Sequence, residues 1–121
     1  MGNLIFTIAT LMLGSIDLIY QEEPTQKILG TWYSEGSRAT KWIYYESGDL
    51  HKYLDNELST VFKYSISHSC GSDSDNEFYF IKWVDSGGTE FCYEINGINE
   101  NNTGILSITS MKTGRISLFE R

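Results

Sequence analysis

Residues 58–68 read Leu-Ser-Thr-Val-Phe-Lys-Tyr-Ser-Ile-Ser-His, and this stretch has the most regular pattern in the chain. Its larger and more apolar side chains recur at every second position, namely Leu58, Thr60, Phe62, Tyr64 and Ile66. The intervening positions are mostly small or polar: Ser59, Val61, Lys63, Ser65 and Ser67. A period of two places alternate side chains on opposite faces of a β-strand. The stretch therefore predicts a strand with one buried face and one wet face.

The rest of the sequence is divided in the same way into short runs separated by turn residues. Including 58–68, the predicted strands are Ile28–Ser34, Ala39–Glu46, Leu50–Asp55, Leu58–His68, Glu77–Val84, Thr89–Asn96, Gly104–Ser110 and Arg115–Arg121. Asn56-Glu57 is expected to form a hairpin turn, and Ser69–Asn76 and Gly97–Asn102 are expected to be polar loops. Short strands at this spacing favour an all-β sandwich or barrel. Consecutive hairpins favour an eight-stranded antiparallel up-and-down barrel, because closure removes exposed edges.

The N-terminal region differs in composition from the rest of the chain. Leu4–Leu13 is an uninterrupted apolar run, and no charge occurs before Asp17. Such a run suits the apolar part of a signal peptide and is too short to span a bilayer, which needs about 20 residues. We therefore expect a signal peptide at 1–20, a linker at 21–27 and a barrel domain at 28–121. This predicts a secreted, periplasmic or cell-envelope protein without a transmembrane anchor; a buried N-terminal helix is the alternative.

The chain has two cysteines, Cys70 and Cys92. An even number of cysteines in a small exported chain favours a disulfide. In the chain-entropy model, closing a loop of about 22 residues stabilises the fold by roughly 3 kcal/mol. Two unpaired thiols are the alternative, whereas a zinc site is disfavoured because the required ligand spacing is absent.

The formal net charge is −7, and the nine basic residues are scattered along the sequence. Nucleic-acid binding needs a patch or stripe of Lys and Arg, so no nucleic-acid partner is expected. Asp73, Asp75 and Glu77 form an acidic segment without the spacing of an EF-hand. A solvated loop is therefore expected there, with no metal and no cofactor.

Ile28-Leu29-Gly30-Thr31-Trp32 resembles the first strand of the calycin superfamily, which includes lipocalins, fatty-acid-binding proteins and avidins. Residues 92–98 (Cys-Tyr-Glu-Ile-Asn-Gly-Ile) and 116–121 (Ile-Ser-Leu-Phe-Glu-Arg) are similar to short lipocalin-like proteins exported by Bacteroidetes. The resemblance covers about residues 28–121. It implies that Trp32 packs across the closed end of the barrel and that Gly30 allows close backbone approach. The Trp and polar pattern of a biotin site cannot be placed, so biotin is not implied.

Aromatic residues are the candidate site, because they can either fill a barrel or line a pocket in its mouth. The predicted interior residues are Trp32, Trp42, Tyr44, Phe62, Tyr64, Phe80, Phe91 and Tyr93, with Tyr45 and Phe78 in the same cluster. So many large rings in a short chain are expected to fill much of the interior. His51 and His68 lie in no recognisable catalytic motif, so no enzyme is expected.

Two hypotheses on function follow from this reading. The first is a monomeric binding module that holds a small apolar ligand at the open end of the barrel. The alternative is a protein-interaction module or enzyme inhibitor acting through the loops Ser69–Asn76 and Gly97–Asn102, because loops on a rigid scaffold often carry recognition.

Overall fold

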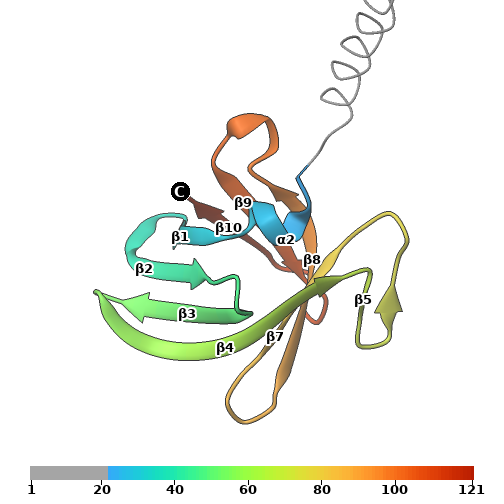
Figure 1. Cartoon of the computed structure of the whole chain (residues 1–121), viewed down its shortest axis with the longest axis horizontal. Helices are drawn as coiled ribbons and strands as arrows, with labels where there is room; N and C mark the ends of the chain where they lie inside the picture. Colours follow the sequence, from blue (N-terminus) through green and yellow to red (C-terminus); the bar gives the residue numbers. More distant parts are fainter. Residues whose placement is uncertain (1–21) are drawn as a thin grey trace, which may run out of the picture.

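A computed structural model describes residues 22–121. Within these residues, eight strands form a closed antiparallel barrel in the cyclic order β1-β10-β9-β8-β7-β4-β3-β2, and a separate two-stranded hairpin is inserted between β4 and β7 (Figure 1). Strands adjacent in the barrel are consecutive along its chain, so the topology is up-and-down. The fold class predicted from the strand pattern is confirmed. The predicted signal peptide lies outside the described residues.

The predicted strands correspond to observed ones with small shifts at their ends. The barrel strands are β1 (Gly30–Ser34), β2 (Ser37–Tyr44), β3 (Asp49–Leu54), β4 (Glu57–Ser67), β7 (Phe80–Val84), β8 (Glu90–Ile98), β9 (Ile105–Ser110) and β10 (Ile116–Glu120). The inserted hairpin consists of β5 (Ser69–Cys70) and β6 (Asp73–Ser74), and a 3-10 turn, η1 (Glu100–Asn102), follows β8. The predicted linker contains a one-turn helix, α2 (Pro24–Lys27).

The turn between β3 and β4 lies one residue earlier than predicted. Its central residues are Asp55 and Asn56, with φ angles of 50° and 67°, rather than Asn56 and Glu57. Two successive positive φ angles characterise the type I′ turn, whose twist matches that of a two-residue hairpin. Asn and Asp tolerate this backbone region better than Glu does, which explains the correction.

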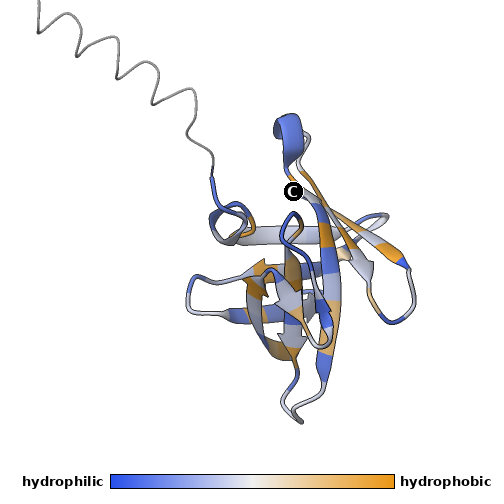
Figure 2. Cartoon of the chain, turned by 90° about the vertical axis from the view of Figure 1, so that its right-hand side faces the viewer, coloured by the Kyte–Doolittle hydropathy of each residue, from blue (hydrophilic) through white to orange (hydrophobic). Residues whose placement is uncertain are grey.

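The alternation predicted for β4 is present. Thr60, Phe62, Tyr64 and Ile66 are half-buried, and the residues between them are exposed; Leu58, near the β3–β4 turn, is also exposed. Hydropathy alternates along the strands, and the connecting turns are mainly hydrophilic (Figure 2). Because side chains alternate across a strand, this pattern places one face of each barrel strand in the interior.

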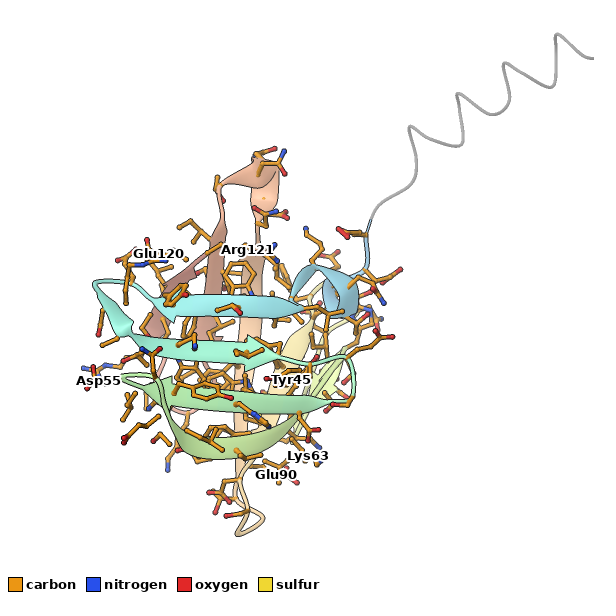
Figure 3. All side chains as sticks on the ribbon, turned by 60° about the vertical axis from the view of Figure 1, so that its left-hand side comes forward. Tyr45, Asp55, Lys63, Glu90, Glu120 and Arg121 are labelled. Atoms are coloured by element: carbon orange, nitrogen blue, oxygen red, sulfur yellow. A yellow bond between two sulfur atoms is a disulfide. The ribbon has the colours of Figure 1, made fainter. Side chains whose placement is uncertain are left out.

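The barrel has two distinct ends, which follow from the strand directions. We call the end with the turns at 35–36, 55–56, 85–89 and 111–115 the open end. The closed end carries α2, the β2–β3 turn, the segment 68–79 and the β8–β9 loop. Figure 3 shows Asp55 and Tyr45 at opposite ends of β3, which marks the two ends of the barrel.

The closed end is sealed around Trp32. The ring of Trp32 is completely buried beside Ile28, and its N–H donates to the Ile28 carbonyl oxygen over 2.8 Å. The Arg121 guanidinium lies 4.3 Å from the centre of the Trp32 ring and also donates to the Lys27 carbonyl oxygen. An ion pair between Lys27 and Glu100 joins α2 to the β8–β9 loop. The first and last strands therefore close this end together.

Gly30 is needed for a different reason from the one expected. Its φ angle is +107°, and a Cβ atom at this position would meet nothing within 4 Å. The expectation of a close backbone approach is therefore wrong. Glycine is favoured because side-chain-bearing residues rarely adopt this backbone conformation, which lets the chain turn from α2 into β1.

A disulfide fastens the inserted hairpin to the outside of the barrel. Cys70 of β5 is bonded to Cys92 of β8, with their Cα atoms 5.8 Å apart and a sequence separation of 22. The predicted disulfide is confirmed. Part of the segment predicted as a polar loop, 69–76, thus forms a β-hairpin. Among residues 22–121, no helix combines the length and the apolar character needed to cross a membrane.

Candidate functional site

A hollow of about 490 Å³ opens at the side of the barrel near its open end. It lies where β1 stops short of β10. In the described chain, the pairing between these strands consists of Tyr33 with Glu120 and Ser34 with Phe119. Its lining comes from the end of β1, from β10 and from the barrel interior: Ser34, Glu35, Trp42, Trp83, Tyr93, Ile108, Ile116, Ser117, Leu118 and Phe119. The short β1–β10 ladder therefore positions the hollow.

The inner wall of the hollow is aromatic and is centred on Trp83. The Trp83 ring centre lies 5.0 Å from that of Trp42 and 4.6 Å from that of Tyr93. Phe62 lies 5.4 Å from Trp83 on another side. A smaller hollow of about 80 Å³ is lined by Phe62, Trp83, Phe91 and Tyr93 and shares Trp83 and Tyr93 with the first. Aromatic pairs at these distances add to the stabilisation from burial and hold the wall rigid.

The three tryptophans differ in how their N–H groups are satisfied. The Trp32 N–H donates to the Ile28 carbonyl oxygen, and the Trp42 N–H donates to the Ser34 hydroxyl over 3.0 Å. Within the described residues, the Trp83 N–H has no hydrogen-bond partner, although only 5% of the residue is exposed. Buried donors in folded proteins are almost always paired, so the Trp83 N–H is an exception.

The hydroxyl group of Tyr44 lies near this donor. Burial raises the pKa of the Tyr44 phenol far above its ordinary value. The nearby Trp83 N–H acts in the opposite direction, but its contact with Tyr44 lacks the geometry of a hydrogen bond. Burial also raises the pKa of Tyr93. Both phenols are therefore neutral at ordinary pH, and the interior around Trp83 is uncharged.

Charged groups lie at the rim of the hollow rather than inside it. Lys52 is in register with Trp42, and its ammonium lies 5.0 Å from the centre of the Trp42 ring. Glu35 lines the outer part of the hollow. Further away, at the closed end, Lys63 pairs with Asp49 and lowers the pKa of that carboxyl group. The arrangement is an open hollow with an aromatic inner wall and a polar outer part that includes Ser34, Glu35 and Ser117.

The structure divides the predicted interior residues between different places. Trp42 and Tyr93 line the larger hollow, and Phe62, Phe91 and Tyr93 line the smaller one. Trp32 lies at the closed end, and Tyr44 and Tyr64 form an edge-to-face pair between the two ends. Tyr45 and Phe78 are exposed.

Phe80 is the predicted interior residue that the structure places elsewhere. On β7 it has the opposite parity to Trp83, and it is buried without belonging to the core cluster. The disulfide-bonded β5 lies against β7, so Phe80 is covered from outside the barrel. The sequence prediction that Phe80 is buried is right, but Phe80 lies on the outer face of β7 and not in the barrel interior. A local pattern does not show that another element, here β5, covers the outer face.

Sequence reasoning missed Trp83, Ile108 and Phe119 as lining residues. A signal for Trp83 was present, since Tyr79, Ile81 and Trp83 are all apolar whereas Lys82 marks the other face of β7. Phe119 had no local signal, because its role depends on pairing between the first and last strands.

A second hollow, of about 230 Å³, lies at the closed end between α2, the β2–β3 turn and β4. It is smaller than most ligand pockets. Among the described residues, no group of three or more His, Cys, Asp or Glu is arranged to hold a metal ion. No protein-family model and no curated protein matches this sequence.

Proposed function

We propose that this protein is an exported, monomeric, lipocalin-like binding module that holds a small apolar ligand in the aromatic hollow at its open end. The observation that carries the proposal is the hollow of about 490 Å³ beside Trp42, Trp83 and Phe119. Ligand sites typically have volumes of about 300–1,000 Å³ and mainly apolar walls with a few polar groups. The closed end offers no comparable chamber within the described residues, because Trp32 and Ile28 fill it.

The remaining features support an exported binder rather than an enzyme. The Cys70–Cys92 disulfide favours an oxidising compartment. The hollow contains no His, and its one carboxylate, Glu35, has no paired base or nucleophile in the lining. The first-strand Gly30-Thr31-Trp32 motif and the barrel topology are compatible with a small calycin-like fold.

The proposal is tested with the neutral fluorescent probe N-phenyl-1-naphthylamine. At about 0.3 kcal/mol per non-hydrogen atom, its roughly 17 such atoms predict a dissociation constant on the order of 0.2 mM or tighter. Ser117→Trp places a bulky ring in the lining at an exposed position and should abolish the fluorescence increase. Ser59→Trp, on the exposed outer face of β4, is the matched control and should bind as the wild type does. Equal binding by both variants would locate the probe outside the hollow and contradict the proposal.

A protein-interaction role at the closed end is the second candidate. It is favoured by the disulfide, which fixes the β5–β6 hairpin beside the barrel and thereby reduces the entropy lost when a partner binds. Native mass spectrometry of the protein purified from its own host separates the two. A bound mass below about 1 kDa supports the ligand-binding proposal, and a bound polypeptide supports the interaction role.

A further inference from the structure

We propose that the ligand of the hollow is a short extended peptide with a free N-terminus, which pairs with the exposed edge of β10 and places its first side chain in the hollow. This inference rests on the proposed function, because it names the class of ligand that the hollow holds. It is carried by the backbone of β10, by the two faces of that strand and by the charge of Glu35.

The first argument is that β10 has a free backbone edge beside the hollow. The Ser110 N–H donates to the Arg115 carbonyl oxygen over 2.8 Å, so Arg115 faces β9. Successive residues of an antiparallel strand face opposite neighbours, and the N–H and C=O of Ile116 therefore point to the side of β1. On that side, the Glu35 N–H donates to the Leu118 carbonyl oxygen over 3.0 Å, and within the described chain no backbone hydrogen bond from β1 reaches Ile116. Ile116 is also 64% exposed, so the described chain leaves this edge uncovered.

The second argument is that this edge is part of the wall of the hollow. Ile116, Ser117 and Leu118 all line it, together with aromatic rings of the interior. Ser117 has the same parity as the buried Phe119, whereas Ile116 has the opposite parity and lies on the outer face. Residues that lie opposite each other on paired strands have their side chains on the same face. A peptide residue opposite Ser117 therefore points its side chain into the hollow, and the next residue, opposite Ile116, points its side chain outward.

The third argument is the charge of Glu35, which determines the direction of the peptide. Glu35 is exposed, lines the outer part of the hollow and forms no ion pair with another of the described residues. Its N–H binds Leu118, so a peptide that continues the line of β1 begins beside Glu35, with its first residue opposite Ser117. Its α-ammonium group then lies next to the Glu35 carboxylate, and opposite charges attract. This direction is antiparallel to β10, as is every strand pair in the barrel.

These three features match a known way of binding peptides. In β-strand addition, main-chain hydrogen bonds provide affinity, and pockets for alternate side chains provide specificity. Here Ile116 offers a donor and an acceptor, the hollow takes an apolar side chain, and Glu35 faces the amino group. The complement is a peptide whose first residue is large and apolar and whose second residue exchanges two hydrogen bonds with Ile116.

The test uses the peptide Phe-Val-Thr-Val amide, with a free amino group, in three forms. The Val N–H at its second position points to β10, whereas the Thr N–H at its third position points away. N-methylation of that Val should weaken binding about tenfold, as expected for a lost hydrogen bond and a blocked edge. N-methylation of the Thr is the matched control and should leave binding within about twofold of the parent peptide. Binding is measured by ¹H–¹⁵N titration, in which the parent peptide should move the Ile116 amide resonance downfield.

Two variants of the protein test the residues that carry the inference. Ile116→Pro removes the N–H on an edge that tolerates proline, and should bring the parent and N-methyl-Val peptides to within about twofold of each other; Ile116→Val keeps the N–H and should keep the tenfold difference. Glu35→Gln should weaken the parent peptide about threefold, as expected for an exposed ion pair. The same variant should leave the N-acetylated peptide unchanged, because that peptide has no ammonium group.

The outcomes separate this inference from the proposed function. If N-phenyl-1-naphthylamine binds and the parent peptide neither displaces it nor moves the Ile116 resonance, the binding module stands and the peptide inference is refuted. Equal binding of the two N-methylated peptides also refutes it, because the edge of β10 then makes no hydrogen bond to the ligand. A wild-type dimer that Ile116→Pro dissociates, in sedimentation experiments, would assign the edge to a second copy of the chain and contradict the inference. If neither the probe nor the peptide binds, both proposals fail.

Discussion

At the closed end of the barrel, Trp32 is completely buried, donates its N–H to Ile28 and lies under the Arg121 guanidinium. At the open end, Trp83 is almost as deeply buried, but its N–H has no partner among the described residues and its ring lines a hollow. The same residue type thus occupies two environments on one barrel. The closed end satisfies the N–H of its tryptophan internally, as a structural core does, whereas the open end keeps an unpaired buried donor and an open hollow.

The largest expected difference between the two ends is in stability. Trp32→Ala should lower the free energy of unfolding by about 3–5 kcal/mol, because it leaves a large cavity and removes a buried hydrogen bond. Phe91→Ala at the open end should lower it by only about 1–2 kcal/mol, since 38% of Phe91 is already exposed. Urea unfolding measures both values, and Trp32→Phe provides a milder variant if Trp32→Ala does not fold. Equal losses at the two ends would remove the distinction drawn between them.

The next largest expected effect is a loss of stability, without a loss of ligand binding, when the disulfide is removed. Replacing both cysteines, in the Cys70→Ser/Cys92→Ser variant, should lower the free energy of unfolding by about 3 kcal/mol through the lost restraint on the unfolded chain. The disulfide lies on the outside of the barrel and not in the lining of the hollow. Binding of N-phenyl-1-naphthylamine should therefore remain within about twofold of wild type when measured well below the denaturation midpoint. A loss of binding in the folded variant would show that the hairpin shapes the hollow.

The smallest expected effect concerns the tyrosines between the two ends. The pKa of Tyr44 is raised in the folded protein by burial, so its phenol ionises in the unfolded chain first. Stability is then fully present below pH 10, the ordinary pKa of tyrosine, and falls as pH rises above that value. Above pH 10, each such tyrosine lowers the free energy of unfolding by about 1.4 kcal/mol per pH unit.

Tyr44→Phe should therefore flatten the decline in unfolding free energy between pH 10 and pH 11, measured by urea unfolding at each pH. Tyr45→Phe is the control on the exposed outer face and should remove a smaller part of the slope, because solvent surrounds its hydroxyl. An unchanged slope in Tyr44→Phe would mean that Tyr44 ionises in the folded state as it does when unfolded.

The strands were predictable because each one depends on a local property. The alternation of side chains in 58–68 indicates which residues lie on each face of β4. Asp, Asn and Gly between the strands indicate turns because they tolerate positive φ angles. The pairing of Cys70 with Cys92 was predictable because a chain with two cysteines allows one intramolecular disulfide. The position of Trp32 at the closed end was predicted from the Gly30-Thr31-Trp32 motif.

The site was only partly predictable, because local patterns do not show what lies opposite a strand. Phe80 and Trp83 are both large and apolar and lie on opposite faces of β7. The inserted hairpin covers one of these faces and the barrel interior covers the other. Lys82 marks the outer face of β7, but nothing within residues 80–84 shows that a hairpin covers Phe80 on that face.

The sequence alone determined the class of this protein: its strand periodicity, its turns, its disulfide and the aromatic content available for an interior. These depend on the conformational preferences of neighbouring residues and on composition. The tertiary structure alone decided where the barrel opens and that Trp42 and Trp83, but not Trp32, line the opening. Both depend on how β1 meets β10, strands separated by more than 80 residues in sequence. Because this pairing ends at Ser34 and Phe119, the wall of the barrel is open there, and the aromatic rings of Trp42 and Trp83 line the opening.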